Sequence, residues 1–278
     1  MDALRLRARD IRHPFHGVSS SGIPNGIREL CAAYLPVMPD GAYFSHETAA
    51  ALLGVPLPPD VQPYPLHVAV ARPRTAPRGR GIVGHSLGNL TGAVVDGIPV
   101  SVPAHAWCQL SGRVGRGDLV AAGDHFVGAR SRPSLVTVDE LAAVSARSAR
   151  TKGASTRAWA LPRIRFGADS RPETLLRLYL EAQGWDELDV NPPLLVDSGL
   201  VTIHPDLASV RGRVVFEYEG DGHRVDRWQW HHDIERRELL EEAGWRVIRV
   251  TSLDLFQDNA AFARRLQRFA PNVGKRDD

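Results

Sequence analysis

The sequence predicts an α/β protein with two domains, on three observations. Near the C-terminus, two apolar runs typical of buried strands, at 214–216 and 245–251, flank a charged helical segment at 227–244. The N-terminal part mixes short strand and helix patterns separated by Pro and Gly. A length of 278 residues, 43% of them apolar, is sufficient for two hydrophobic cores.

Composition restricts the environment and the partners of the chain. A net charge of +2 gives no attraction of the whole protein to nucleic acid, so DNA binding has to come from local basic surfaces. Cys31 and Cys108 are isolated, which predicts buried thiols in a reducing cytoplasm and no cysteine-based zinc site. No run approaches the length of a membrane span, and the first residues lack a signal-peptide pattern. We therefore expect a soluble, cytoplasmic protein without membrane contact.

Residues 1–150 are predicted to form a smaller α+β region. Ser45 can cap a helix that Gly54 ends, and Asp96-Gly97 is typical of a tight hairpin between two strands. The expected elements are helices at 26–34 and 45–54, strands at 66–70, 82–85 and 93–100 with the hairpin inside it, and helices at 104–110, 118–122 and 138–146.

Two basic segments each have two interpretations. Residues 72–81 form a basic loop without acids, which either contacts phosphates or is a solvated hairpin tip. Residues 151–168 lie in a longer stretch without acids and have a linker-like composition, so we place a basic linker between the domains there. Lys152 and Arg157 in this linker are predicted to face DNA, because neutralising phosphates releases counterions. The alternative is a mobile connector.

Residues 169–272 are predicted to form the second domain, followed by a frayed tail at 273–278. Ser170 and Glu173 have the spacing of a capping box at the start of its first helix. The expected elements are a helix at 170–184, a hairpin at 194–203, a strand into 214–219, a helix at 227–244, a strand at 245–251 parallel to the previous one, and a helix at 259–269.

Carboxylates at the end of the 214–219 strand indicate a cation. Strand side chains alternate, so Glu217 and Glu219 point to the same side. Buried carboxylates are costly and repel each other, which raises one of their pKa values unless a cation neutralises them. Mg²⁺ or Mn²⁺ suits such oxygen ligands. For Glu217 the alternative is a buried ion pair with an arginine.

Asp206 has two interpretations of the same kind. It follows Pro205, which cannot donate to a sheet ladder and so lies at an edge or a bend. Asp206 is either the cap of a turn or a metal ligand. The metal interpretation requires that two adjacent strands bring its carboxylate and that of Glu217 to one point.

These motifs resemble, in their order and spacing, the very-short-patch-repair-like branch of the PD-(D/E)XK nuclease superfamily. They are Asp206, Glu217-Tyr218-Glu219-Gly220, His223, Asp233 with Arg236-Arg237, and Gly244-Trp245-Arg246-Val247. The resemblance extends from Ser170 onward and implies a restriction-endonuclease-like core with a mixed central sheet flanked by helices. The branch most often has Asp where this chain has Glu219, and the superfamily's Lys is absent from that position, departures that concern the catalytic rate more than the fold.

The resemblance implies a metal-dependent endonuclease that hydrolyses DNA phosphodiester bonds. Asp206 and Glu217 would hold Mg²⁺ (or Mn²⁺), with Glu173 as a helix-borne acid near the ion. The ion would lower the pKa of a bound water and stabilise the charge that develops on phosphorus. Glu219 occupies the position of the residue that orients the attacking water, and His223 would assist proton transfer.

Other contacts and functions stay open. Arg236 and Arg237 either pair with Asp233 along their helix or reach a DNA phosphate. The N-terminal pattern of an alanine-rich helix, a strand pair and a helix opening near residue 104 resembles the antitoxin-like region of abortive-infection type IV toxin–antitoxin systems, which implies a partly winged-helix-like fold. The rival functions are therefore a catalytically weak or inactive nucleic-acid-binding protein and an antitoxin-like transcriptional regulator.

Overall fold

The chain divides into two compact units. The computed structural model describes residues 12–20, 22–185, 187–220 and 227–268. The first unit comprises residues 1–127 with Ser134–Ile164, and the second comprises Gly128–Pro133 with residues 165–278. The boundary between the units lies inside the predicted linker at 151–168, but α6 (Ala154–Ala160) and the short helix η3 (Leu161–Arg163) occupy most of that segment and belong to the first unit.

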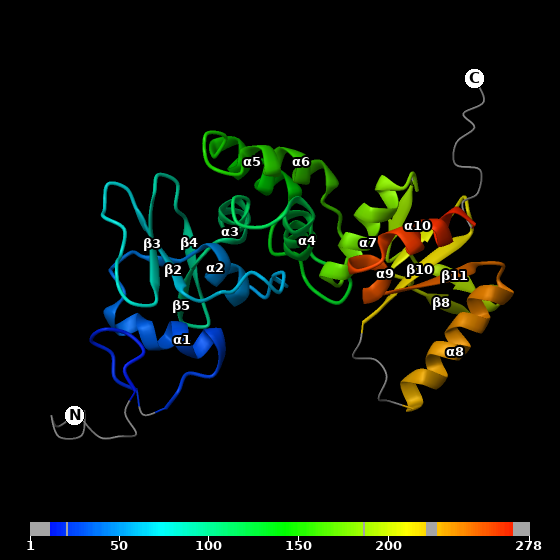
Figure 1. Cartoon of the computed structure of the whole chain (residues 1–278), viewed down its shortest axis with the longest axis horizontal. Coiled ribbons are helices and arrows are strands. Elements are labelled where there is room, and N and C mark those ends of the chain that lie inside the picture. The colour runs from blue at the N-terminus through cyan, green and yellow to red at the C-terminus, as the bar shows by residue number, and fades with distance from the viewer. Residues whose placement is uncertain (1–11, 21, 186, 221–226, 269–278) are drawn as a thin grey trace. The chain divides into compact units, whose positions relative to one another are not determined.

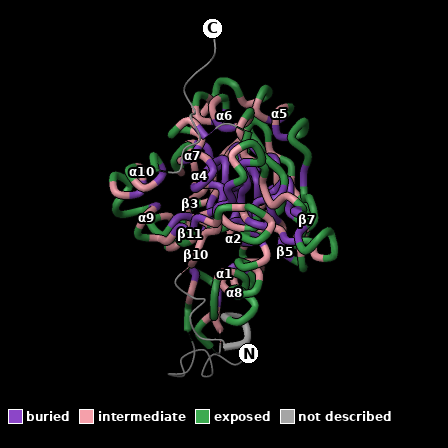
Figure 2. Tube along the Cα trace, turned by 90° about the vertical axis from the view of Figure 1, so that its right-hand side faces the viewer, coloured by how far each residue is buried: buried purple, intermediate pink, exposed green. Residues whose placement is uncertain are grey.

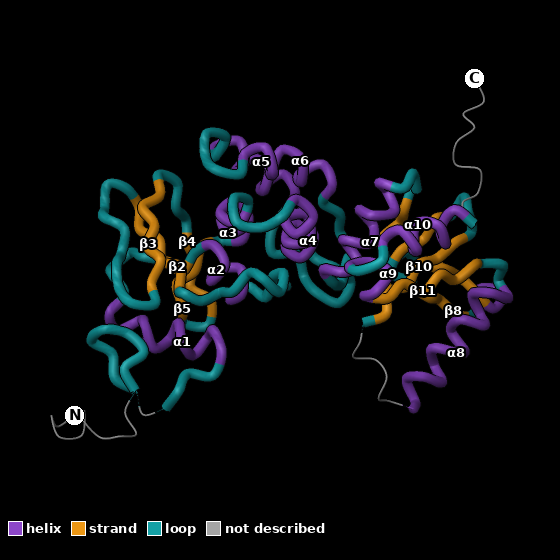
Figure 3. The backbone as a smooth tube through the Cα atoms, in the orientation of Figure 1, coloured by secondary structure: helices purple, strands orange, loops and turns teal. Residues whose placement is uncertain are grey.

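The first unit is built on a five-stranded mixed sheet with the strand order β3-β2-β1-β5-β4 (Figures 1 and 3). β2 and β3 are parallel, as are β1 and β5, whereas the β1–β2 and β4–β5 pairs are antiparallel. The predicted hairpin is confirmed: its two central residues, Asp96 and Gly97, have φ values of 50° and 79°, as such tight turns require. The strands are β1 (Tyr43–Phe44), β2 (Leu66–Ala71), β3 (Ile82–Leu87), β4 (Gly92–Val95) and β5 (Ile98–Ser101).

Helices of the first unit pack around a buried tryptophan. Trp107 is fully buried and its indole N–H donates to the Leu119 carbonyl oxygen (2.9 Å). Gly123 approaches Trp107 and Ile164 so closely that a Cβ would clash there. Its helix, α4, is buried over its last nine residues, as Figure 2 indicates by colour. The helices are α1 (Gly26–Tyr34), η2 (Leu35–Val37), α2 (His46–Leu52), α3 (Pro103–Leu110), α4 (Arg116–Val127) and α5 (Val138–Arg147), followed by α6 and η3.

The second unit contains a four-stranded sheet with the order β11-β10-β9-β6. β10 (Val214–Glu219) and β11 (Arg246–Thr251) are parallel, which confirms the prediction from their strand–helix–strand order. β9 (Leu207–Ser209) is antiparallel to β10, and β6 (Leu188–Val190) is antiparallel to β9. The predicted hairpin is also confirmed, as the separate pair β7 (Leu194–Val196) and β8 (Val201–Ile203) joined by η4 (Asp197–Gly199).

Helices cover both faces of the four-stranded sheet, as Figure 1 shows. Phe216 packs with Leu176 and Phe262 on one face, whereas Val215, its neighbour in β10, packs with Leu240 on the other. This alternation is that of a strand buried on both sides. The helices are α7 (Arg171–Ala182), α9 (Ser252–Phe256) and α10 (Asn259–Gln267) on the first face and α8 (Arg227–Glu242) on the second.

The α/β prediction is therefore confirmed. The finer predictions, a restriction-endonuclease-like core and a partly winged-helix-like N-terminal region, stay predictions. In the part of the chain that the structure describes, no helix has the length and apolar character required to cross a membrane.

Candidate active site

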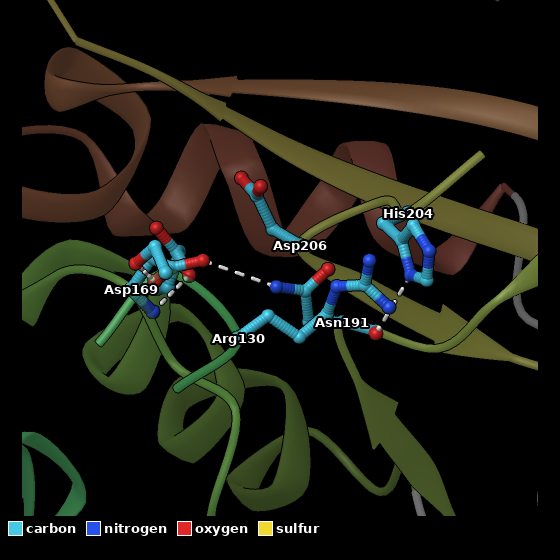
Figure 4. Close-up of a pocket in the computed structure, with 7 residues that line it drawn as sticks. Arg130, Asp169, Asn191, His204 and Asp206 are labelled. Carbon is cyan, nitrogen blue, oxygen red and sulfur yellow. Dashed lines mark hydrogen bonds between the residues drawn. The ribbon is translucent and has the colours of Figure 1, made fainter. Parts of the chain in front are cut away.

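An open pocket in the second unit collects two of the predicted acids (Figure 4). Its volume is about 540 Å³. Glu173 comes from the first turn of α7, and Asp206 immediately precedes β9. The lining residues are Arg130, Ser131, Asp169, Glu173, Asn191, His204 and Asp206. Sequence analysis had therefore identified two members of this pocket from distant parts of the chain.

Asp206 is the acid of the pocket whose pKa is raised to near neutrality. Leu207 pairs with Phe216, so the antiparallel register places Asp206 beside Glu217. The Tyr218 N–H donates to Asp206 Oδ2 (2.7 Å). Burial and the charges of Glu173 and Glu217 raise the pKa of Asp206 to about 7. The Tyr218 hydrogen bond and the Arg236 charge oppose this rise without cancelling it.

Glu173 both caps its helix and contributes charge to the pocket. Its N–H donates to Ser170 Oγ (3.4 Å), which confirms the predicted cap, and its Oε2 accepts from the Asp169 N–H (2.9 Å). The side chain is only 8% exposed. Burial raises the pKa of Glu173, with a smaller contribution from the Asp169 charge. Capping and membership of the acidic site thus occur together.

Glu217 has the arginine partner that sequence analysis gave as the alternative. Arg236 Nη2 lies 2.9 Å from Glu217 Oε1 and donates to the His204 carbonyl oxygen (2.6 Å). The contact with Glu217 does not have hydrogen-bond geometry, so Oε1 is buried without a hydrogen-bond partner among the described residues. One of the carboxylate's oxygens is therefore still unsatisfied, despite the nearby positive charge.

Two further predicted residues pair with charged side chains of the second unit. Glu219 pairs with Arg249 of β11, and Arg237 pairs with Glu241 (2.8 Å) one turn along α8. Arg236 and Arg237 thus pair with Glu217 and Glu241, whereas the prediction for these two arginines was Asp233 or a DNA phosphate. His223 lies outside the described residues.

The predicted DNA contacts of the basic segment need correction. Arg157 is fully buried in the first unit, where its guanidinium donates to Ser111 Oγ (2.6 Å) and to the Ser148 carbonyl oxygen (2.6 Å). A group enclosed in this way cannot reach a phosphate, so its predicted role is wrong. Lys152 is exposed, and its carbonyl oxygen accepts a further bond from Arg157 (3.2 Å).

Sequence analysis missed the polar residues that frame the pocket. Asn191 Nδ2 donates to Asp169 Oδ2 (3.1 Å), and Ser131 Oγ donates to the other oxygen of the same carboxylate. His204 Nδ1 lies 3.3 Å from the Asn191 carbonyl oxygen. Asn191 precedes two prolines, which was the available sequence signal for a turn, and in the structure its φ is 51°. Nothing in the sequence pattern indicated that Arg130 and Ser131 belong to this unit.

No family model, curated protein or solved structure matches the chain. The chemistry of the site is consequently argued from the side chains themselves.

The acidic residues fit a hard divalent cation in donor type but not in spacing. Asp206, Glu173 and Glu217 supply carboxylate oxygens, the donors that Mg²⁺ and Mn²⁺ prefer. The raised pKa of Asp206 indicates missing positive charge, whereas Glu217 Oε1 lacks a hydrogen bond among the described residues but lies 2.9 Å from Arg236 Nη2. Among the described residues, however, only a group of three histidines in the first unit brings ligand atoms within 4.8 Å of one another. Binding a shared ion would require the Glu217 side chain to turn away from Arg236.

Proposed function

We propose that this chain is a metal-dependent endonuclease that hydrolyses DNA phosphodiester bonds. The observation that supports the proposal is the half-buried Asp206 carboxylate in the lining of an open pocket, with its pKa raised by the charges of two further acids, Glu173 and Glu217. Such a group is unfavourable when ionised, and a divalent cation would convert repulsion among the acids into attraction.

Each residue of the site has a separate role in this proposal. Asp206 and Glu217 would hold Mg²⁺ or Mn²⁺, and Glu173 would add negative charge beside it. Bound there, the ion would supply an activated water and stabilise charge on the phosphate. Arg236, released by Glu217, would keep its hydrogen bond to the His204 carbonyl oxygen and present its remaining donors to a DNA phosphate. Glu219, with Arg249 as its partner, would orient water from the next position along the strand.

A nucleic-acid-binding protein without cleavage activity is the second candidate. The pairing of Glu217 with Arg236 and of Glu219 with Arg249 favours it, because arginines already neutralise both strand carboxylates. The absence of a lysine at the Glu219 position favours it as well.

Plasmid cleavage by the full-length chain distinguishes the two candidates. With millimolar Mg²⁺ or Mn²⁺, we expect nicking of supercoiled DNA that chelation abolishes. Glu217→Gln should lower the rate by about 100-fold or more, since even outer-shell partners of a metal are worth about 10–100-fold. Glu241→Gln makes the same chemical change on an α8 residue outside the pocket and should leave the rate unchanged.

If the chain retards DNA on a gel but nicks it with neither metal, the second candidate, nucleic-acid binding without cleavage, is the correct function. Nicking that survives in Glu217→Gln would show that this carboxylate is not part of the active site.

A further inference from the structure

Three histidines meet in the first unit, although they are far apart in the sequence. His46 is the first residue of α2, His67 lies on β2 and His85 on β3. β2 and β3 are parallel with Ala69 opposite His85, so His67 and His85 project from the same face of the sheet. One ring nitrogen of each histidine lies within 4.8 Å of those of the other two.

The spacing of these nitrogens is close to that of ligands around one ion. His67 Nδ1 and His85 Nε2 are 3.0 Å apart. Two nitrogens bound to one zinc ion at tetrahedral angles are separated by about 3.3 Å, because each Zn–N bond is about 2.0–2.1 Å. His46 stacks on His85 with ring centroids 3.8 Å apart and 22° between the ring planes, so the rings would have to turn out of this stack for all three nitrogens to point at one ion.

All three rings have their lone pairs available at neutral pH. Burial lowers the pKa of His46 to about 2, with help from the neighbouring histidines, and lowers the pKa of His85 to about 4. Burial lowers the pKa of His67 as well, although Glu47 opposes the change. Neutral imidazole is the form that binds metal ions.

A buried carboxylate, that of Glu47, lies beside the histidine cluster. Glu47 is 3% exposed, and its Oε1 accepts from Arg113 Nε (2.5 Å). Its Oε2 lies 3.3 Å from His67 Nδ1 without hydrogen-bond geometry, and so is a buried oxygen with no hydrogen-bond partner among the described residues. If the histidines only formed a hydrogen-bonded network, Glu47 Oε2 should accept one of those hydrogen bonds. A bound cation would instead be attracted by the negative charge of Glu47 without needing that hydrogen bond.

The backbone at His46 is also held in an uncommon conformation. Its φ of 52° lies in the left-handed region that side-chain-bearing residues rarely adopt. Its N–H donates to Gln109 Oε1 (3.0 Å), and its Nδ1 lies 3.0 Å from Ser45 Oγ. Such strain persists where surrounding contacts fix a side chain in position, often at a functional site. His46 and His85 are each partly exposed, which leaves an entry route for an ion.

We propose that His46, His67 and His85 bind one transition-metal ion of the zinc class, with Glu47 as the anionic neighbour of the site. Three neutral imidazoles suit Zn²⁺ or Co²⁺ and disfavour Mg²⁺, which requires oxygen ligands. Three protein ligands leave a fourth position for water or an anion. This site is independent of the endonuclease proposal, because its ligands, its metal class and its structural unit all differ.

Co²⁺ titration of the chelator-stripped full-length chain tests the proposal. We expect one Co²⁺ per chain at this site with the visible absorption of a tetrahedral nitrogen-rich complex, displaced by Zn²⁺ and unaffected by millimolar Mg²⁺. His46→Gln and His85→Gln should each weaken binding by about 100-fold or more. His105→Gln removes another buried histidine of the same unit, one whose Nδ1 accepts from the Thr91 N–H, and should leave binding unchanged.

Two results would overturn the site: no Co²⁺ absorption with the folded wild-type chain, or equal affinity in the wild type and both histidine variants. If a variant does not fold, ¹⁵N NMR of the wild-type imidazole nitrogens decides, because Zn²⁺ must shift the resonances of three histidines together. A spectrum in which these rings do not respond contradicts the proposal. Asp206→Asn should keep full Co²⁺ affinity here, so failure of the carboxylate site and failure of the histidine site are separable.

Discussion

At Asp206, burial and the neighbouring negative charges both raise the pKa of the carboxyl group. Removal from water disfavours the ionised carboxylate, and Glu173 and Glu217 add repulsion. One hydrogen bond from the Tyr218 N–H compensates only in part. An ionised Asp206 therefore lowers the free energy of unfolding unless a cation joins the group, which links the stability of the chain to the proposed metal.

Asp206→Asn should stabilise the chain at about pH 8 in the presence of a chelator, by about 1–2 kcal/mol, and change little at about pH 4. The folded-state pKa of about 7 is above the ordinary value of 3.8. Between these values the folded state holds a proton that the unfolded state has released, so wild-type stability falls as pH rises. Asn is neutral throughout, and its Oδ1 can still accept from Tyr218. Denaturant unfolding at the two pH values measures the difference.

Asp189→Asn supplies the matched control, since it changes an exposed aspartate of β6 in the same sheet and should leave the pH dependence unaltered. A variant Asp206→Asn that is less stable than the wild type at about pH 8 would contradict the electrostatic account.

At this scale, sequence analysis predicted which acids are close but not their immediate partners. The alternation along 214–219 and the position of Asp206 were sufficient to predict neighbouring carboxylates. The arginine that meets Glu217, Arg236, comes from α8, which packs on the sheet through Leu240. Local pattern contains no information about this contact.

At the scale of elements, α6 carries a basic residue, Arg157, whose hydrogen bonds lie in the interior of the first unit. Arg157 lies at its centre, fully buried, and donates to Ser111 Oγ, Ser148 O, Lys152 O and Thr151 Oγ1. These acceptors lie at the C-terminal ends of α3 and α5 and in the turn before α6. One guanidinium thus joins three elements through groups that helix ends leave unsatisfied.

Arg157→Ala should destabilise the first unit by about 3 kcal/mol or more, because several buried acceptors would lose a charged donor at once. Thermal unfolding followed by circular dichroism measures the loss. Arg150→Ala, an exposed arginine before the same turn, should change stability by less than about 0.5 kcal/mol. Equal, small effects of the two substitutions would refute the joining role of Arg157.

Elements with strong local signals were predictable, and the shortest ones were not. The hairpin turn at Asp96-Gly97 and the cap at Ser170 require particular residue types, so they are visible in the sequence. β1, β6 and β9 contain only two or three residues each, too few to show a period of two. They are strands because their backbones complete sheets with partners distant in sequence. Arg157 was misassigned for a related reason: charge along the chain does not indicate burial.

At the scale of the whole molecule, two α/β units carry two different sets of possible metal ligands. The first unit offers imidazole nitrogens, and the second offers carboxylate oxygens. Composition and order predicted two units with a boundary in 151–168, and within that segment it falls between residues 164 and 165 because α6 and η3 pack within the first unit. Gly128–Pro133 belongs to the second unit because of tertiary contacts. One of them is the hydrogen bond that the Gly167 N–H donates to the Gly128 carbonyl oxygen (3.1 Å).

The binding of Mn²⁺ to the full-length chain, followed by electron paramagnetic resonance, tests the central claim most directly. The account predicts one Mn²⁺ that Mg²⁺ displaces, with affinity reduced by about 100-fold or more in Asp206→Asn and unchanged in His85→Gln. Equal Mn²⁺ affinity in the wild type and Asp206→Asn, or no bound Mn²⁺ at all, would contradict a catalytic metal at the carboxylate pocket.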